Sequence, residues 1–192
     1  TFRDFSYDAS SVNTYRQQYG KKPSVDQPEW SRFKCDQVNS SILAIRKAMR
    51  KVSPTMQLSA TCFANIRAAT EEKGQDPRDW LEKGLLDWVV PMMYERNTQN
   101  FASRLDDWNR AFASQWRSRM WVGINVDFNN EGEIIRQLGA MQNQGYNGAL
   151  LFAYSSLFPA RKPNAKAEAI RSLWQEQSIR DILLKTSPPS SR

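Results

Sequence analysis

Six polar side chains stand where the sequence leaves apolar, strand-like runs, so a folded chain could bring them to one place. They are Asn65, Tyr94, Glu95, Asn125, Asp127 and Tyr154. General acid–base chemistry needs carboxyl groups that give and take a proton, so Glu95 and Asp127 are the candidate catalytic residues. The amides and phenols of the other four can hydrogen-bond to a sugar or stack on it, and they are the candidate substrate-binding residues.

The absence of histidine from all 192 residues excludes several kinds of chemistry. His-based triads, imidazole bases and histidine-containing zinc sites all need that side chain. The two cysteines, Cys35 and Cys62, are too few for a four-thiolate metal site, and no Walker or GxGxxG string occurs. The sequence therefore predicts no metal site and no redox or nucleotide cofactor.

The chain is basic, with 27 Lys and Arg residues against 20 Asp and Glu residues and a formal charge of +7. Residues 32–51 hold six of the basic residues and one acid, but these charges fall between the apolar positions of a helix. That arrangement is typical of a solvated helix face, so no nucleic-acid partner is expected. No run of about 18 apolar residues occurs, so no transmembrane segment is predicted.

A long helix is predicted over residues 29–52 from an apolar stripe at steps of three and four residues. The stripe consists of Cys35, Val38, Ile42, Ile45, Met49 and Val52. A cysteine within such a stripe favours a buried structural role over a reactive thiol. A shorter helix over residues 10–19 precedes it and ends at Gly20.

Four strand-length apolar runs alternate with helical patterns through the rest of the chain. The runs cover residues 56–64, 87–94, 120–126 and 148–154, and helices are expected over 78–83, 98–114, 131–144 and 165–185. Nearly continuous apolar runs between helices indicate parallel strands that are buried on both faces. A Rossmann-like sheet would show a glycine-rich turn after its first strand, and no such turn occurs in this sequence. The α/β pattern therefore favours half of a (β/α)8 TIM barrel, which needs about 250 residues when complete.

The candidate residues would share one edge of such a barrel, because enzymes of this fold carry their chemistry at the carboxyl ends of the strands. Some of these residues could instead have a purely structural role. Glu95 could be a solvated loop acid next to Arg96. Asp127 and Asn65 could form caps or turns, and Tyr94 could pack at the rim of the core.

Four segments resemble the carboxyl-terminal half of the glycosyl hydrolase-like family ten domain, a bacterial family of (β/α)8 barrels. They are DFSYDASSVNTYRQQYG, WSRFKCDQVNSSILAIRKAMRKVSP, QDPRDWLEKGLLDWVVPMMY and GYNGALLFAYSSLF. The most specific string is GLLDWVVPMMY, which is similar to the family's Gly-Leu-x-Asp-x-x-x-Pro-Met-x-Tyr pattern on the sixth barrel strand. Its matching residues are Gly84, Asp87, Pro91, Met92 and Tyr94. Met93 stands where the family usually carries Asn.

The resemblance implies that residues 1–186 form strands five to eight of one barrel domain, followed by a disordered Ser/Pro tail over 187–192. It also implies that the family's favoured catalytic acid ends strand four, before Thr1, so residues 1–192 alone are expected to be inactive. The chain opens without an initiator Met, which indicates a processed precursor or a piece of a longer protein. An extracytoplasmic or cell-envelope location follows from the resemblance alone.

Three functions are weighed against these observations. The first is hydrolysis of O-glycosidic bonds in a polysaccharide or cell-envelope glycan by a carboxylate acid/base pair, with a carbohydrate as the partner. The second is a non-catalytic carbohydrate-binding or scaffold barrel that keeps the cleft without the pair. A basic nucleic-acid-binding domain is the weakest of the three, because no basic-aromatic recognition segment occurs. The sequence does not predict the oligomeric state.

Overall fold

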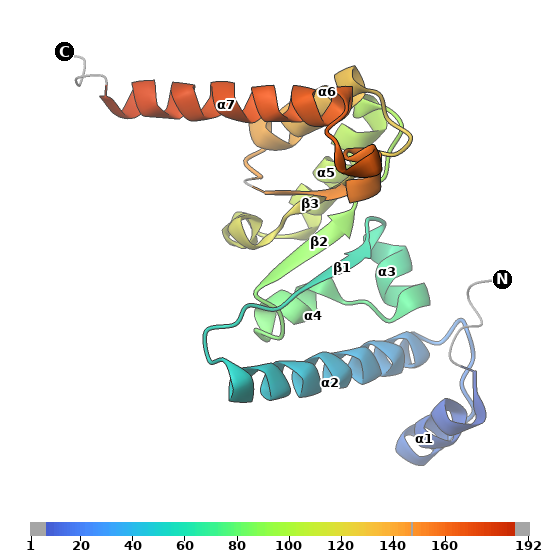
Figure 1. Cartoon of the computed structure of the whole chain (residues 1–192). Coiled ribbons are helices and arrows are strands. Elements are labelled where there is room, and N and C mark those ends of the chain that lie inside the picture. The colour runs from blue at the N-terminus through green and yellow to red at the C-terminus, as the bar shows by residue number, and fades with distance from the viewer. Residues whose placement is uncertain (1–6, 147, 187–192) are drawn as a thin grey trace, which may run out of the picture.

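Four short strands form one parallel sheet in the order β1-β2-β3-β4 (Figure 1). A computed structural model describes residues 7–146 and 148–186 of the chain. The strands are β1 (Ser59–Phe63), β2 (Trp88–Met92), β3 (Val122–Asn125) and β4 (Ala149–Phe152). Each neighbouring pair is parallel, and helices lie in the connections between the strands. The predicted α/β class with four parallel units is thereby confirmed, and the arrangement is consistent with a partial TIM barrel.

The helices follow the predicted order, with boundaries that differ by a few residues. They are α1 (Ala9–Tyr19), α2 (Pro28–Val52), α3 (Ile66–Lys73), α4 (Pro77–Glu82), α5 (Thr98–Ala111), α6 (Glu131–Asn143) and α7 (Ala165–Thr186), with short 3-10 turns η2 (Ser114–Arg119), η3 (Tyr154–Ser156) and η4 (Pro159–Arg161). The sequence predicted only a polar stretch where α3 forms. Asn65 caps the start of α3 by accepting a hydrogen bond from the Ala68 amide, and Gly74 ends it in a left-handed conformation. The predicted tail over 187–192 lies outside the described residues.

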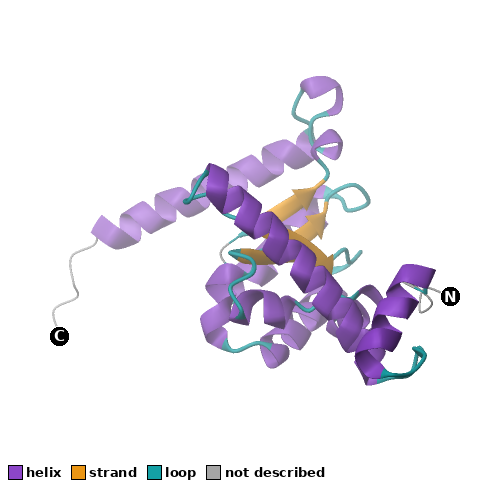
Figure 2. Cartoon of the chain, turned by 90° about the horizontal axis from the view of Figure 1, so that it is seen from below, coloured by secondary structure: helices purple, strands orange, loops and turns teal. Residues whose placement is uncertain are grey.

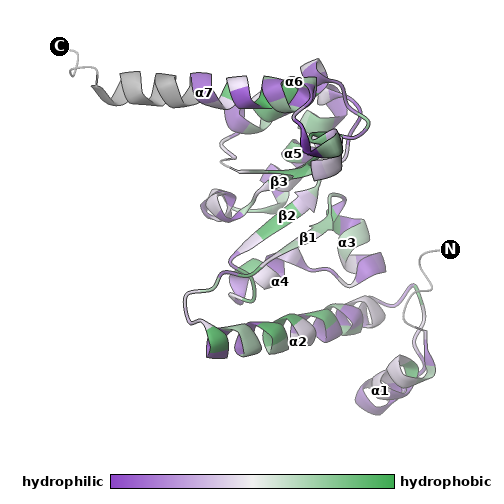
Figure 3. Ribbon diagram, viewed as in Figure 1, coloured by the Kyte–Doolittle hydropathy of each residue, from purple (hydrophilic) through white to green (hydrophobic). Residues whose placement is uncertain are grey.

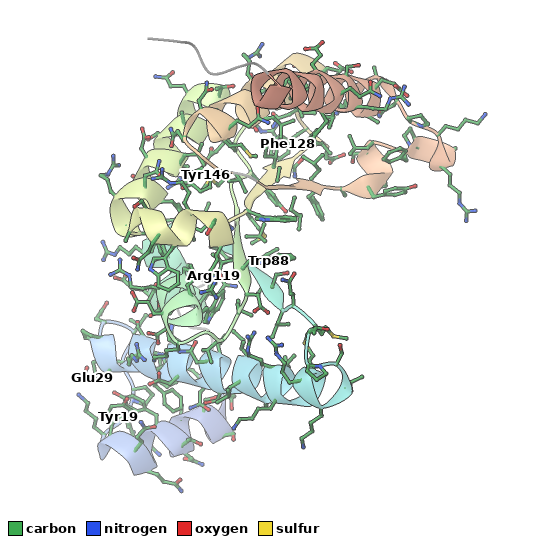
Figure 4. All side chains as sticks on the ribbon, turned by 90° about the vertical axis from the view of Figure 1, so that its left-hand side faces the viewer. Tyr19, Glu29, Trp88, Arg119, Phe128 and Tyr146 are labelled. Carbon is green, nitrogen blue, oxygen red and sulfur yellow. The ribbon has the colours of Figure 1, made fainter. Side chains whose placement is uncertain are left out.

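Helices cover one face of the sheet, whereas the other face is open within the described part of the chain (Figure 4). Helix α5 packs on α6 and α6 packs on α7, while α2 packs on α3. Helices α2 and α7 flank the two ends of the row of strands (Figure 1). Seen from below, α2 crosses the front of the molecule with the strands behind it (Figure 2).

Side chains along the strands alternate between these two faces. Cys62, Val89 and Ile124 belong to the buried core between sheet and helices. Phe63 and Phe152 lie on the opposite face and are exposed. In Figure 3 the middle of β2 is hydrophobic and its two ends are paler. Leu150 is exposed as well, so the open face presents apolar side chains.

The apolar stripe on α2 is only partly buried, since Val38, Ile42 and Met49 are half-buried. Cys35 is buried there, and its thiol donates to the carbonyl of Thr70 on α3 at 3.6 Å. Ile45 and Val52 are exposed, although both belong to the predicted stripe. Helix α2 has 25 residues and α3, on which it packs, has only eight. Helix α2 also contacts α4, where Asp79 accepts hydrogen bonds from Arg32 and Asn39. These described partners leave Ile45 and Val52 exposed.

Candidate functional site

The carboxyl ends of the four strands lie at one edge of the sheet, because all four strands are parallel. The register pairs Phe63 of β1 with Met92 of β2, and Asn125 of β3 with Phe152 of β4. We call the residues that end or follow the strands here the carboxyl edge. All six residues predicted to form a site belong to it, but their side chains have different surroundings.

Tyr94 is the candidate residue most directly joined to another strand. Its ring stacks on Phe152 with centroids 5.7 Å apart and planes 23° apart. Partial burial raises the pKa of the Tyr94 phenol above its ordinary value of 10.0. The ring and hydroxyl thus form a half-buried aromatic surface between the ends of β2 and β4, of the kind that stacks on sugar rings.

Glu95 lies beside Tyr94 in sequence but directs its carboxylate toward helix α5. Its Oε1 lies 3.5 Å from Nη2 of Arg104, an α5 residue. The predicted neighbour Arg96 instead places its guanidinium over the ring of Phe128, 4.4 Å from the centroid; Phe128 is labelled in Figure 4. Strand alternation explains this placement, because consecutive residues leaving β2 point to opposite faces of the sheet. The structure does not bring the Glu95 and Asp127 carboxylates into contact.

Asp127 is the exposed carboxylate of the two predicted. Its Oδ1 accepts a hydrogen bond from the Ser156 hydroxyl at 3.0 Å. Lys166 donates from Nζ to the main-chain carbonyls of Val126 and Asp127 at 2.8 and 3.1 Å. These contacts join the loop after β3 to the loop after β4 and to α7, so Asp127 stands on a fixed segment with its carboxylate at the surface.

The side-chain oxygens of Asn125 and Asn65 both accept hydrogen bonds from nearby backbone amides. Asn125 Oδ1 accepts from the amides of Asp127 and Phe128 at 2.8 and 3.3 Å, which shapes the turn after β3. Asn65 Oδ1 accepts from Ala68 at 2.9 Å as the cap of α3. The local geometry therefore gives both asparagines a structural task, as the alternative interpretation of Asn65 predicted.

Tyr154 is exposed, with 65% of its surface accessible. Its ring stacks on Phe158 with centroids 4.7 Å apart and planes 19° apart. The pair forms a second aromatic surface beyond β4, separate from the stack of Tyr94 on Phe152. A planar, exposed ring held by a neighbouring ring is suited to stack on a pyranose face.

The structure also shows site residues that sequence reasoning missed. Phe152 could have been found, because it is an aromatic residue at the carboxyl end of the predicted strand over 148–154, where the other candidates were sought. Arg104 and Gln137 carried no signal in the sequence. Their contacts with Glu95 join residues nine and 42 positions apart, which only the packing of α5 and α6 decides.

The two thiols are not suited to metal or redox chemistry. Burial raises the pKa of Cys35 to about 12, and it also raises the pKa of Cys62. Within residues 7–146 and 148–186, no three Cys, Asp or Glu side chains are grouped so that they could hold a metal ion. None of the helices in the described part of the chain is long and apolar enough to cross a membrane.

The fold and the carboxyl edge together define a parallel β/α protein with aromatic, amide and carboxylate groups at the ends of its strands. The chain matches the model of the family described as glycosyl hydrolase-like 10 over residues 1–133, and it belongs to that family. The match extends from before α1 to the first turn of α6. A search of curated proteins and a search of solved structures found no match.

Proposed function

We propose that residues 1–186 form the strand-five-to-eight part of a barrel that hydrolyses O-glycosidic bonds of a polysaccharide or cell-envelope glycan. The observation that carries this proposal is the exposed carboxylate of Asp127 on the same edge as the aromatic surface of Tyr94 and Phe152. Rings of this kind bind sugar faces, and a carboxyl group beside them can give or take a proton at the glycosidic oxygen. Membership of the glycosyl hydrolase-like 10 family supports the same class of substrate.

Glycoside hydrolysis requires a second carboxyl group, about 5 to 5.5 Å from the first in retaining enzymes and about 6.5 to 9.5 Å in inverting ones. The family resemblance assigns that group to the end of barrel strand four, outside residues 1–192. Glu95 is the second candidate within the chain, although its contact with Arg104 draws the carboxylate toward α5. The proposed order is therefore Asp127 first and Glu95 second, with Tyr94, Tyr154, Asn65 and Asn125 around the sugar.

The alternative function is a carbohydrate-binding or scaffold barrel without catalysis. One observation favours it, namely that Glu95 forms an ion pair with Arg104 on the helix side. Of the two predicted catalytic carboxylates, only that of Asp127 is then exposed at the carboxyl edge. The aromatic surfaces would serve such a protein equally well. An extracytoplasmic or cell-envelope location, which the resemblance implies, fits either function.

The test compares Asp127→Asn and Glu95→Gln in the full-length protein. Release of reducing ends and equilibrium binding are measured on the same cell-envelope glycan. We expect Asp127→Asn to lower kcat by about a hundredfold or more, the usual effect of a positioned acid or base, with glycan binding retained. Asp106→Asn is the matched control, because this exposed α5 carboxylate bonds only to the Gln144 amide among the contacts of the described residues.

The outcomes separate the two functions. A wild-type protein that binds glycans without cleaving them supports the scaffold barrel. Turnover that survives Asp127→Asn and is lost in Glu95→Gln makes Glu95 the catalytic residue. A wild-type protein that neither binds nor cleaves glycans contradicts both proposals.

A further inference from the structure

The main-chain carbonyl oxygen of Glu95 accepts two side-chain amides from separate elements. Nδ2 of Asn129, in the loop after β3, donates to it at 3.0 Å, and Nε2 of Gln137, on α6, donates to it at 3.0 Å. Asn129 is 3% exposed and Gln137 is fully buried. Two donors satisfy both lone pairs of a carbonyl, so the peptide group after Glu95 is fixed from two directions.

Each of these amides is held by a further partner. Nδ2 of Asn129 also donates to the carbonyl of Asn125 at 3.0 Å, which joins the loop after β2 to the end of β3. Nε2 of Gln137 also lies 3.3 Å from Glu133 Oε1. The same Glu133 oxygen accepts a 2.6 Å hydrogen bond from the hydroxyl of Thr98 on α5. The network thus connects the loop after β2 with β3, α5 and α6.

Burial makes this network stiff. Leaving a buried polar group without its hydrogen-bond partner lowers the stability of the fold by more than a surface hydrogen bond contributes, because no water replaces the partner. All members of the network are residues of the described chain, and within it only Oε1 of Gln137 is buried with no hydrogen-bond partner. It holds the peptide between Glu95 and Arg96, one residue after Tyr94. The ring of Tyr94 contacts Phe152 on the open face of the sheet.

We propose that Asn129 and Gln137 are positioning residues that fix the Tyr94–Glu95 segment at the carboxyl edge for glycan binding and turnover. This inference rests on the proposed function for its role in activity, and on the geometry alone for its effect on the segment. Neither residue touches the sugar. Each acts through the Glu95 carbonyl, and through it on the direction in which the Tyr94 ring leaves β2.

The experiment uses two variants of the full-length protein, Gln137→Leu and Asn129→Asp. The first removes the amide and keeps most of the volume, and the second keeps the shape and replaces the donor by an acceptor. Asn143→Ala is the control, because Asn143 is an exposed residue at the end of the same helix. Hydrogen exchange of amides 94–97 is measured beside that of β3 and α6, together with kcat and KM on the glycan that the wild type cleaves.

We expect exchange of amides 94–97 to rise about tenfold in both variants, as the loss of one hydrogen bond implies, while exchange in β3 stays unchanged. We expect kcat/KM to fall by about ten- to a hundredfold, because a displaced group near the reacting atoms loses its alignment. The control should match the wild type in every measurement.

Two results would overturn the inference. The first is unchanged exchange of amides 94–97 in a folded variant. The second is exchange that rises equally in β3, α6 and the segment, because this would show a general loss of stability instead of positioning. If exchange rises only over 94–97 and the wild type has no activity on glycans, the positioning of the segment stands and the proposed function fails.

Discussion

The ring of Tyr94, which follows β2, stacks on the ring of Phe152, which ends β4. The contact therefore crosses β3, the strand between them. Asn125 ends β3 in register with Phe152 and is only 7% exposed. The two rings thus join the outer strands of this part of the carboxyl edge around a buried amide, and they turn an open row of strand ends into a continuous surface.

Removing the Phe152 ring should lower the pKa of Tyr94. Partial burial raises this pKa above 10.0, and Phe152→Ala gives the phenol more access to water, which stabilises its charged form. The measurement is an ultraviolet absorbance titration of the tyrosines, with Tyr94→Phe used to identify the signal of Tyr94. Phe158→Ala is the matched control, because it removes the ring that stacks on Tyr154 instead. An unchanged Tyr94 titration in Phe152→Ala would contradict the prediction.

The carboxylate of Asp87 should make stability depend on acid pH. Hydrogen bonds from Arg46 at 3.0 and 3.2 Å and from the Leu58 amide at 2.7 Å lower its pKa below the ordinary value of 3.8. A lowered pKa in the folded state contributes stability that is fully present above the unfolded-state pKa and is lost as pH falls through the folded-state pKa.

The test for Asp87 is urea unfolding of the wild type and of Asp87→Asn across a pH series. The difference in free energy of unfolding should be largest near neutral pH and should shrink as pH falls below about 4. A difference that stays constant down to the lowest pH at which the wild type folds would show that the carboxylate charge is not what stabilises this contact.

Gly148→Ala should destabilise the protein by about 1 to 3 kcal/mol through overpacking. A Cβ atom at Gly148 would lie 2.5 Å from the ring of Trp121, and that ring is itself stacked on Trp88 with centroids 4.8 Å apart. Figure 4 labels Trp88 on the sheet. The measurement is urea unfolding followed by tryptophan fluorescence. Gly139→Ala on α6 is the control, since nothing lies within 4 Å of the added Cβ and the helix should gain stability. Equal stability of the two variants would refute the steric argument.

A polypeptide of residues 1–192 by itself should self-associate or unfold at low temperature. Within the described sheet β1 and β4 each pair with a single strand, and Leu150, Phe152 and Phe63 are exposed on the open face. Unpaired edges and apolar faces of this kind promote association. Sedimentation and calorimetry test the prediction, and Leu150→Lys should reduce the association. A monomer with a sharp, cooperative thermal transition would disprove it.

Local patterns in the sequence were sufficient to predict the architecture. The apolar runs ending near Met92 and Asn125 are strands, and the stripe that contains Cys35 is a helix, as their periods indicate. Parallel pairing followed from the alternation of these elements. The GLLDWVVPMMY string and its neighbours indicated the family that the match over residues 1–133 establishes. Helix α3 was missed because its stability depends on the caps at Asn65 and Gly74 more than on an apolar stripe.

The sequence by itself thus determined the class of fold, the family and the set of polar residues at the ends of the strands. Only the tertiary structure decided what each side chain does there. Glu95 and Tyr94 are adjacent in sequence, yet one meets Arg104 on the helix side and the other meets Phe152 across β3. The physical reason is that periodicity is a local property of the chain, whereas the partners of a residue that leaves a strand come from distant segments, and their position depends on how helices pack on the sheet.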